Sequence, residues 1–215
     1  MSLPHAVIIA GGKGERLGGV RKADLRVGGR RLLDRVAESL GSIAQPLMVA
    51  TGPGETPLPL PAGAIGLADI DAPLGGPLAG LAAAVQALQA RGIGTGFLVS
   101  VAVDTPFLPV DFVAVMLEAL GDAPAAYATW GEQFYPPNAL WRIEALSALP
   151  QQVRSGGAAP SLKALQHALG AAAVDWASRA GSDPFANVNT IGDLISLGRM
   201  AAAGAPSALI HTTGN

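Results

Sequence analysis

Residues 9–22 read Ile-Ala-Gly-Gly-Lys-Gly-Glu-Arg-Leu-Gly-Gly-Val-Arg-Lys and follow the apolar residues 6–8, Ala-Val-Ile. A short apolar run that ends in glycines is typical of a buried parallel strand leading into a loop. Glycines at positions 11, 12, 14, 18 and 19 allow a positive φ and a close approach of the backbone to a ligand. Main-chain N–H groups in such a loop can converge on phosphate oxygens, so the stretch indicates an anion-binding turn after a parallel strand.

The loop matches neither of the two common phosphate motifs. A P-loop needs Lys-Ser or Lys-Thr after its last glycine, which is absent here, and a dinucleotide-binding fingerprint needs a glycine where Leu17 stands. The glycines alone are equally consistent with a flexible surface loop.

The charge distribution favours the ligand-binding interpretation. The chain has a net charge of −2, yet eight of its 14 Lys and Arg residues lie within residues 1–35, against three acidic residues there. The eight are Lys13, Arg16, Arg21, Lys22, Arg26, Arg30, Arg31 and Arg35. Cations gathered around one loop of an acidic chain favour an anionic ligand.

Composition narrows the class of protein. With 215 residues, half of them apolar and 14% charged, we expect one domain over residues 1–203 and a frayed tail at 204–215. The chain has no cysteine, which excludes disulfides, thiolate metal sites and a cysteine nucleophile. The acidic balance argues against a nucleic-acid partner. The lack of a long apolar run or a signal-peptide pattern predicts a cytoplasmic protein without a membrane partner.

Apolar strand patterns alternate with helical ones along the chain. Strands are expected at residues 6–9, 46–50, 64–68, 97–103, 125–129, 138–141 and 172–176. Helices are expected at residues 31–40, 77–90, 110–120, 143–149, 161–169 and 191–203. This alternation predicts an α/β domain with a mostly parallel sheet.

Asp104 ends the apolar run 97–103 and is followed by Thr105-Pro106. Ligands of open α/β sheets lie outside the carboxyl ends of the strands, and Mg²⁺ prefers carboxylate oxygens shared with substrate phosphates. Asp104 is therefore a candidate metal ligand. A carboxylate that only caps the helix near residue 110 fits the local pattern equally well.

Two further segments carry polar groups at expected strand or helix ends. Asp69 and Asp71 follow an expected strand and precede Gly75-Gly76-Pro77. A carboxylate at the end of that strand could accept hydrogen bonds from a base or a ribose. An ordinary loop-to-helix junction explains the glycines but not both acids.

Asn187 and Asn189 precede Thr190, a predicted N-cap. They share a side if the segment is extended, where they could meet a ligand or a metal-bound phosphate.

Together these segments resemble the molybdenum cofactor guanylyltransferase (MobA) family, from about Val7 to about Leu197. The matching pieces occur in the family's order. They are Ile9-Ala10-Gly11-Gly12, Arg16-Leu17-Gly18-Gly19 with Lys22, Asp69 with Gly76-Pro77-Leu78-Ala79-Gly80, Asp104-Thr105-Pro106, Pro137 with Ala139-Leu140-Trp141, and Phe185 with Asn187-Val188-Asn189-Thr190.

The resemblance implies a Rossmann-like three-layer α/β/α nucleotidyltransferase of the nucleotide-diphospho-sugar transferase type. It implies transfer of GMP from GTP to Mo-molybdopterin with Mg²⁺ as cofactor, releasing pyrophosphate and forming the guanine dinucleotide cofactor. Molybdopterin-synthesis proteins and a recipient molybdoenzyme or its chaperone are the implied protein partners.

The resemblance also assigns roles to residues of this chain. GTP would be held by Ile9, Ala10, Gly11, Gly12 and Lys22. Asp69 would contact the nucleotide, Asp104 would bind Mg²⁺, and Asn187 and Asn189 would lie toward the pterin or the metal. Lys22 and Asp104 are the expected catalytic residues.

This chain departs from the family at four places: Arg21 before Lys22, Tyr135-Pro136-Pro137, Arg154-Ser155-Gly156-Gly157, and Ile191-Gly192. These departures concern the pterin side more than the nucleotide side. A cytidylyltransferase acting on the same pterin remains an alternative, although Gly11-Gly12 favours GTP over CTP. A sugar-phosphate nucleotidyltransferase and a non-catalytic carrier of molybdopterin or nucleotide are the others.

Overall fold

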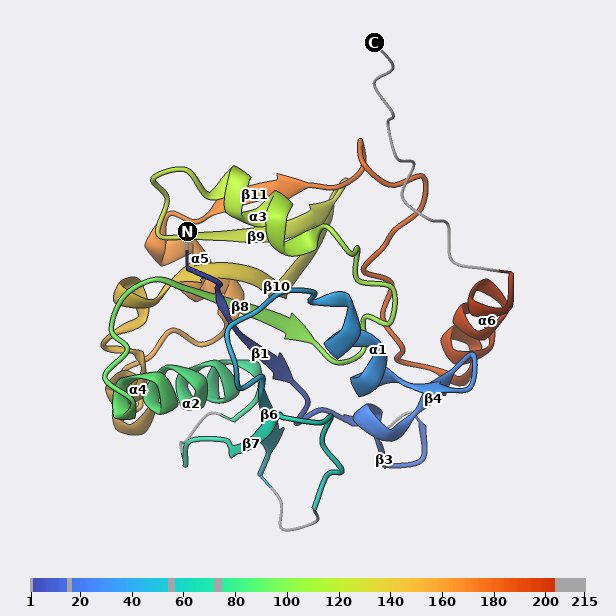
Figure 1. Ribbon diagram of the computed structural model, residues 1–215, viewed down its shortest axis with the longest axis horizontal. Helices are drawn as coiled ribbons and strands as arrows, with labels where there is room; N and C mark the ends of the chain where they lie inside the picture. Colours follow the sequence, from blue (N-terminus) through green and yellow to red (C-terminus); the bar gives the residue numbers. More distant parts are fainter. Residues whose placement is uncertain (1, 15–16, 54–56, 72–74, 204–215) are drawn as a thin grey trace.

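A seven-stranded sheet forms the centre of the computed structural model, which describes residues 2–14, 17–53, 57–71 and 75–203 (Figure 1). Its strands lie in the order β11-β9-β10-β8-β1-β6-β7. Their bounds are β1 His5–Ile9, β6 Met48–Gly52, β7 Ile65–Ala68, β8 Phe97–Ala102, β9 Ala125–Trp130, β10 Gln133–Arg142 and β11 Ala172–Asp175. β10 is antiparallel to β8 and β9, and the other pairings are parallel. The predicted mostly parallel sheet is therefore confirmed.

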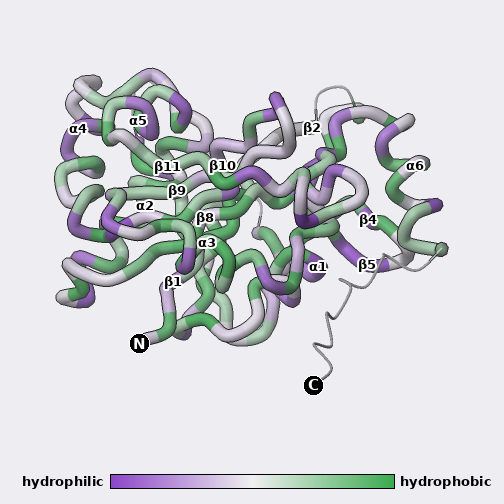
Figure 2. The backbone as a smooth tube through the Cα atoms, turned by 90° about the horizontal axis from the view of Figure 1, so that it is seen from above, coloured by the Kyte–Doolittle hydropathy of each residue, from purple (hydrophilic) through white to green (hydrophobic). Residues whose placement is uncertain are grey.

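Helices cover both faces of this sheet. They are α1 Leu32–Ser39, α2 Pro77–Ala90, α3 Phe112–Leu120, α4 Leu149–Ser155, α5 Leu162–Leu169 and α6 Ile191–Ala202, with 3₁₀ turns η2 Lys22–Asp24 and η3 Ile143–Leu146. Successive side chains of β1 point to opposite faces. Ile8 packs into the core that holds α1 and α3, whereas Val7 packs into the core that holds α2, α4 and α5. The result is the predicted three-layer α/β/α arrangement, with apolar segments through its centre (Figure 2).

The segment between β1 and α1 contains two small hairpins, β2 Lys13–Gly14 with β3 Val20–Arg21 and β4 Arg26–Val27 with β5 Arg30–Arg31. The final helix α6 packs beside β4, at the opposite end of the molecule from α4 (Figures 1 and 2). The chain therefore returns from the far side of the sheet to the region of the glycine loop. The predicted tail at residues 204–215 lies outside the described residues.

One predicted helix is wrong. Residues 143–149 form η3 and the turn after it, and the helix begins at Leu149 with Pro150 in its first turn. Proline there lacks only an N–H that a helix leaves unpaired in any case, so Pro150 begins a helix instead of ending one. Among the described residues, no helix is long and apolar enough to cross a membrane.

Candidate active site

A cavity of about 260 Å³ lies at the carboxyl ends of β1 and β8, where an open α/β sheet places its ligands. Its lining includes predicted site residues from five separate segments of the chain. These are Ile9, Gly11, Gly12, Lys22, Asp69, Asp104 and Asn187. Ala10, also predicted, is fully buried below the loop, and its N–H donates to Ala50 O at 2.8 Å.

Gly11 allows the loop to lie directly against the end of β6. A Cβ added at Gly11 would lie 2.5 Å from Gly52 Cα, and a Cβ at Gly52 would lie 2.6 Å from Gly11 Cα. Gly52 also has a φ of +79°, which favours glycine. A Cβ at Gly12, by contrast, would meet only Lys22 Cδ, at 3.9 Å. Gly11 is thus required by packing, whereas Gly12 leaves backbone open to the cavity.

Lys22 connects the glycine loop to two distant segments. Its Nζ lies 2.7 Å from Asp104 Oδ2 and donates a 2.6 Å hydrogen bond to Asn189 Oδ1. The side chains of Lys22 and Asp104 are only 13% and 16% exposed. The carboxylate and amide oxygens therefore converge on one position for a cation, which the ammonium of Lys22 fills.

The segment that carries Asn189 is fixed from both ends. Val188 N–H donates to Asp104 O at 3.1 Å. At the start of α6, Thr190 Oγ1 accepts from Asp193 N, while Asp193 Oδ2 accepts from the N–H groups of Thr190 and Asn189. The hydrogen bond from Asn189 N–H is the main reason that the pKa of Asp193 lies below its usual value. The predicted N-cap is confirmed, and this capping box also holds the backbone of Asn189.

Asp69 also lines the cavity and follows β7, the strand at the edge of the sheet. Burial raises the pKa of its carboxyl, and a hydrogen bond from the Gly52 backbone opposes that rise. Asp71 does not line this cavity; with Asp69 and Arg154 it lines a shallower hollow of about 600 Å³ beside β7 and α2. Of the two carboxylates, only Asp69 therefore belongs to the candidate active site, although both line the second hollow.

The wall formed by β10 includes Asn138, which the sequence patterns did not indicate as a site residue. Pro136 and Pro137 lie within β10, and its pairing with β9 shifts register between Tyr135 and Ala139, as expected where prolines interrupt a ladder. In place of ladder bonds, Ser100 Oγ donates to Pro137 O at 2.7 Å, and Asn138 Oδ1 accepts from Ala102 N–H at 2.8 Å. The signal that could have found Asn138 is the double proline, which predicts a bulge.

Tyr135 of β10 also lines the cavity and contacts the segment before α6. Its hydroxyl donates to Asp183, and burial and then this carboxylate raise the pKa of Tyr135. Asp183 Oδ1 in turn accepts from Phe185 N–H at 2.9 Å, and the Phe185 ring lies 5.1 Å from that of Tyr135. Tyr135, one of the positions at which the chain departs from the family pattern, thus has a structural role. It connects β10 to the segment that carries Asn187 and Asn189.

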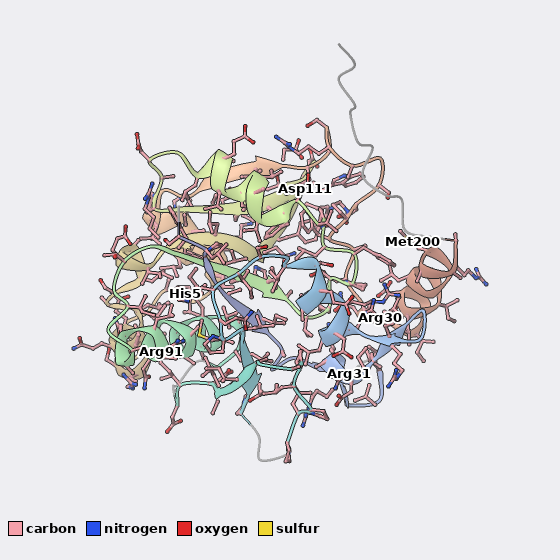
Figure 3. All side chains as sticks on the ribbon, viewed as in Figure 1. His5, Arg30, Arg31, Arg91, Asp111 and Met200 are labelled. Carbon is pink, nitrogen blue, oxygen red and sulfur yellow. The ribbon has the colours of Figure 1, made fainter. Side chains whose placement is uncertain are left out.

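Most of the described cations of the N-terminal segment bond to protein groups, not to the cavity. Arg31 pairs with Asp34 and donates to Pro59 O, while Arg30 pairs with Glu38. Both lie beside α1 (Figure 3). Arg35 donates to Val27 O. Among the cations whose side chains the structure describes, Lys22 is the one that lines the cavity. Lys22, and not the whole cluster, therefore favours an anionic ligand; the side chains of Lys13 and Arg16 lie outside the described part of the chain.

Comparison with known proteins shows the family of this chain. Residues 6–176 match the family model described as the MobA-like NTP transferase domain. The chain belongs to this family. Curated relatives named molybdenum cofactor guanylyltransferase include one from Acidiphilium cryptum, 37% identical over 88% of this chain and 91% of its own. Another, from Cereibacter sphaeroides, is 35% identical over 87% of this chain and 92% of its own. The predicted family resemblance is therefore confirmed.

Solved structures show the same fold as this MobA-like domain. The molybdopterin-guanine dinucleotide biosynthesis protein A of Archaeoglobus fulgidus matches with a TM-score of 0.67 at 17% identity, over 93% of this chain and 99% of that one. The 2-C-methyl-D-erythritol 4-phosphate cytidylyltransferase of Thermus thermophilus matches with a TM-score of 0.63 at 24% identity, over 94% and 100%. The predicted nucleotidyltransferase fold is confirmed by these matches.

Proposed function

We propose that this protein transfers GMP from GTP to the terminal phosphate of Mo-molybdopterin and releases pyrophosphate. The names of the curated relatives support the reaction. The observation that carries it in this chain is the convergence of Lys22, Asp104 and Asn189 beside an open glycine backbone. The relatives named above are guanylyltransferases, which supports GTP; the cytidylyltransferase shares only the fold.

The nucleotide would lie over β1 and β6. Gly11 and Gly12 offer backbone close to the cavity, with Ile9 and the buried Ala10 behind them. Asp69, which also lines the cavity, would accept hydrogen bonds from the base or the ribose. Lys22 would leave its position between Asp104 and Asn189 and donate to the triphosphate, because phosphate oxygens offer an ammonium more negative charge than one carboxylate.

The residues present fit a divalent metal. Asp104 Oδ2 and Asn189 Oδ1 already surround one cationic atom, the Nζ of Lys22. Among the described residues no group of three or more His, Cys, Asp or Glu side chains could hold a metal. Mg²⁺ commonly takes one or two carboxylates and completes its shell with water and substrate phosphate. We therefore propose that Asp104 holds Mg²⁺, which would neutralise charge that develops on the leaving pyrophosphate.

The chemistry asks little covalent work of the protein. A phosphate oxygen of the acceptor attacks the α-phosphorus of GTP, the bond from that phosphorus to the oxygen of the β-phosphate breaks, and pyrophosphate leaves. The nucleophile is already an anion, so no base is required. The residues of the cavity act by alignment and by charge stabilisation. We further propose a cytoplasmic location, with molybdopterin-synthesis proteins as donors and a molybdoenzyme or its chaperone as recipient.

Pyrophosphate release with Mo-molybdopterin and GTP, CTP or ATP tests this function. We expect release with GTP, at least about a hundredfold slower in Asp104→Ala because a charge-stabilising group is lost. Asp111→Ala is the matched control. Asp111 follows the same strand and lies exposed at the start of α3 (Figure 3), where its side chain makes no capping hydrogen bond. Release with CTP alone would replace the proposed substrate, and background release with every nucleotide would favour a carrier.

A further inference from the structure

The side-chain amide of Asn138 is held in one orientation. Its oxygen accepts a 2.8 Å hydrogen bond from Ala102 N–H. Because a backbone N–H must meet an acceptor, Oδ1 faces β8 and Nδ2 is the end left over. Asn138 is 1% exposed and lines the cavity. Its Nδ2 is buried and has no hydrogen-bond partner in the described part of the chain.

The bond to Ala102 does not explain an amide at this position. Only an oxygen is needed there, whereas buried donors in native proteins are nearly always paired. Gln166 provides a comparison beside the same bulge: it is also 1% exposed, its Nε2 donates to Pro136 O at 2.9 Å, and its Oε1 has no partner among the described residues. Gln166 does not line the cavity, and neither do Trp130 and Trp176, whose buried Nε1 donors are also unpaired there. Asn138 differs from these residues because it borders the cavity, where a ligand can supply the missing acceptor.

The surroundings of Asn138 suit a flat polar ring. Phe134, Tyr135 and Pro137 line the same part of β10 and offer apolar faces. Asn187, from the segment before α6, lines the cavity too, and its Oδ1 is likewise buried without a partner among the described residues. One unpaired donor and one unpaired acceptor match a ring that carries a carbonyl next to an N–H.

The order of the strands separates this ring from the nucleotide. Neighbouring strands of the sheet lie in the order β10-β8-β1-β6. The glycine backbone follows β1 and packs on β6, whereas Asn138 belongs to β10. Asp104, after β8, lies between them. A ligand at Asn138 is therefore on the acceptor side of the reacting phosphates.

We propose that Asn138 Nδ2 donates to the ring carbonyl of a 2-amino-4-oxopyrimidine, the edge that a pterin presents, while Asn187 Oδ1 accepts from the neighbouring ring N–H. This inference rests on the proposed function and assigns its acceptor subsite. Guanine carries the same edge, so the experiment must separate pterin binding from GTP binding.

Pterin-6-carboxylate is a fluorescent probe for the subsite, and GTP with Mg²⁺ can be followed by thermal shift. Asn138→Asp keeps an oxygen for Ala102 N–H but removes the donor. We expect its affinity for the probe to fall about tenfold, or ~1.4 kcal/mol, while stabilisation by GTP is retained. Asn138→Leu, which has a similar size and neither polar group, should lose probe binding as well and serves if the buried carboxylate prevents folding.

Gln166→Met is the matched control, since it removes a buried amide next to the bulge that does not border the cavity. It should lower the melting temperature and leave probe affinity within twofold. The inference is overturned if Asn138→Asp binds the probe as wild type does, if it loses probe and GTP equally, or if the wild-type protein binds GTP but not the probe. Pyrophosphate release judges the proposed function separately, so the two can fail independently.

Discussion

Lys22 and Asp104, 82 positions apart in the chain, form an ion pair in which Nζ lies 2.7 Å from Oδ2. Asn189 Oδ1 accepts from the same ammonium at 2.6 Å. The pair joins the glycine loop to the end of β8, and the amide adds the segment before α6. Because both charged side chains are largely buried, the interaction is screened less than a surface ion pair would be.

This pair predicts that Lys22 competes with a metal for Asp104. In Lys22→Met the ammonium is gone, so a divalent ion no longer has to displace it. We expect the affinity for Mn²⁺ without nucleotide to rise by about tenfold, and the affinity for GTP to fall by about ten- to hundredfold as one charged contact is lost. Electron paramagnetic resonance of Mn²⁺ and calorimetry with GTP measure the two effects.

Arg30→Met is the control for this prediction. Arg30 belongs to the same cationic segment but pairs with Glu38, with both side chains at least half exposed, and exposed pairs contribute little. Both affinities should stay as in wild type. Unchanged Mn²⁺ binding in Lys22→Met would show that Lys22 and the metal do not share Asp104.

The contact between Gly11 and Gly52 predicts unequal effects at two adjacent glycines. Gly11→Ala would place a methyl 2.5 Å from Gly52 Cα, so the loop must move away from β6. Overpacking of this kind costs about 1–3 kcal/mol, and we expect weaker GTP binding as well. Gly12→Ala meets only Lys22 Cδ at 3.9 Å and should change stability by less than about 0.5 kcal/mol. Urea denaturation measures both; equal destabilisation would contradict the packing argument.

Local patterns predicted the parts of the fold that depend on neighbours in sequence. The apolar run before Asp104 marks β8, because a strand buried on both faces is continuously apolar. Thr190 with Asp193 marks the start of α6, because a capping box is contained within four residues. The carboxyl-end rule for parallel strands predicted a ligand beside Asp104, and the family resemblance added Asp69 and Lys22. All three residues line one cavity.

Features that depend on tertiary contacts were not predicted. Arg31 and Arg35 donate hydrogen bonds to the carbonyls of Pro59 and Val27. No local sequence pattern reveals these contacts, so the sequence alone favours a ligand for the whole cationic segment. Asn138 was missed for the same reason: its amide is oriented by Ala102, 36 positions away, across a bulge whose register depends on pairing.

Asp69 predicts a conflict between stability and binding. Burial raises the pKa of this carboxyl, so its charged form is disfavoured in the folded protein. The resulting loss of stability is absent at low pH and develops as pH rises from the unfolded pKa through the raised folded one. Asp69→Asn removes the charge and keeps an oxygen for the Gly52 backbone. It should melt higher than wild type at pH 7, with the difference disappearing near pH 3.

The same substitution should weaken GTP binding by about tenfold, because a charged acceptor is replaced by a neutral one. Asp71→Asn is the control: Asp71 is exposed and does not line the cavity. Thermal melts from pH 3 to 7 and calorimetry with GTP provide the measurements. If Asp69→Asn melts lower than wild type at pH 7, the carboxylate is stabilising, and its burial is compensated by contacts that outweigh desolvation.

The capping box predicts that the start of α6 loosens in acid. The hydrogen bonds from Asn189 and Thr190 lower the pKa of Asp193, so its contribution to stability is complete above the unfolded value of about 3.9 and is lost as pH falls through the lower folded value. Thr190→Ala should cost ~1 kcal/mol at pH 7. Asp193→Asn should lose its difference from wild type below the folded pKa, whereas Thr190→Ala should keep part of its own.

Because Asp193 also holds Asn189 N–H, loosening this cap should reach the active site. In Asp193→Asn we expect turnover to fall several-fold at pH 7 and hydrogen exchange at the Asn189 amide to accelerate, since Asn189 Oδ1 then positions Lys22 less firmly. Arg199→Ala, in the last turn of the same helix, is the control and should change neither. Faster exchange with unchanged turnover would show that Asn189 does not need its cap to position Lys22.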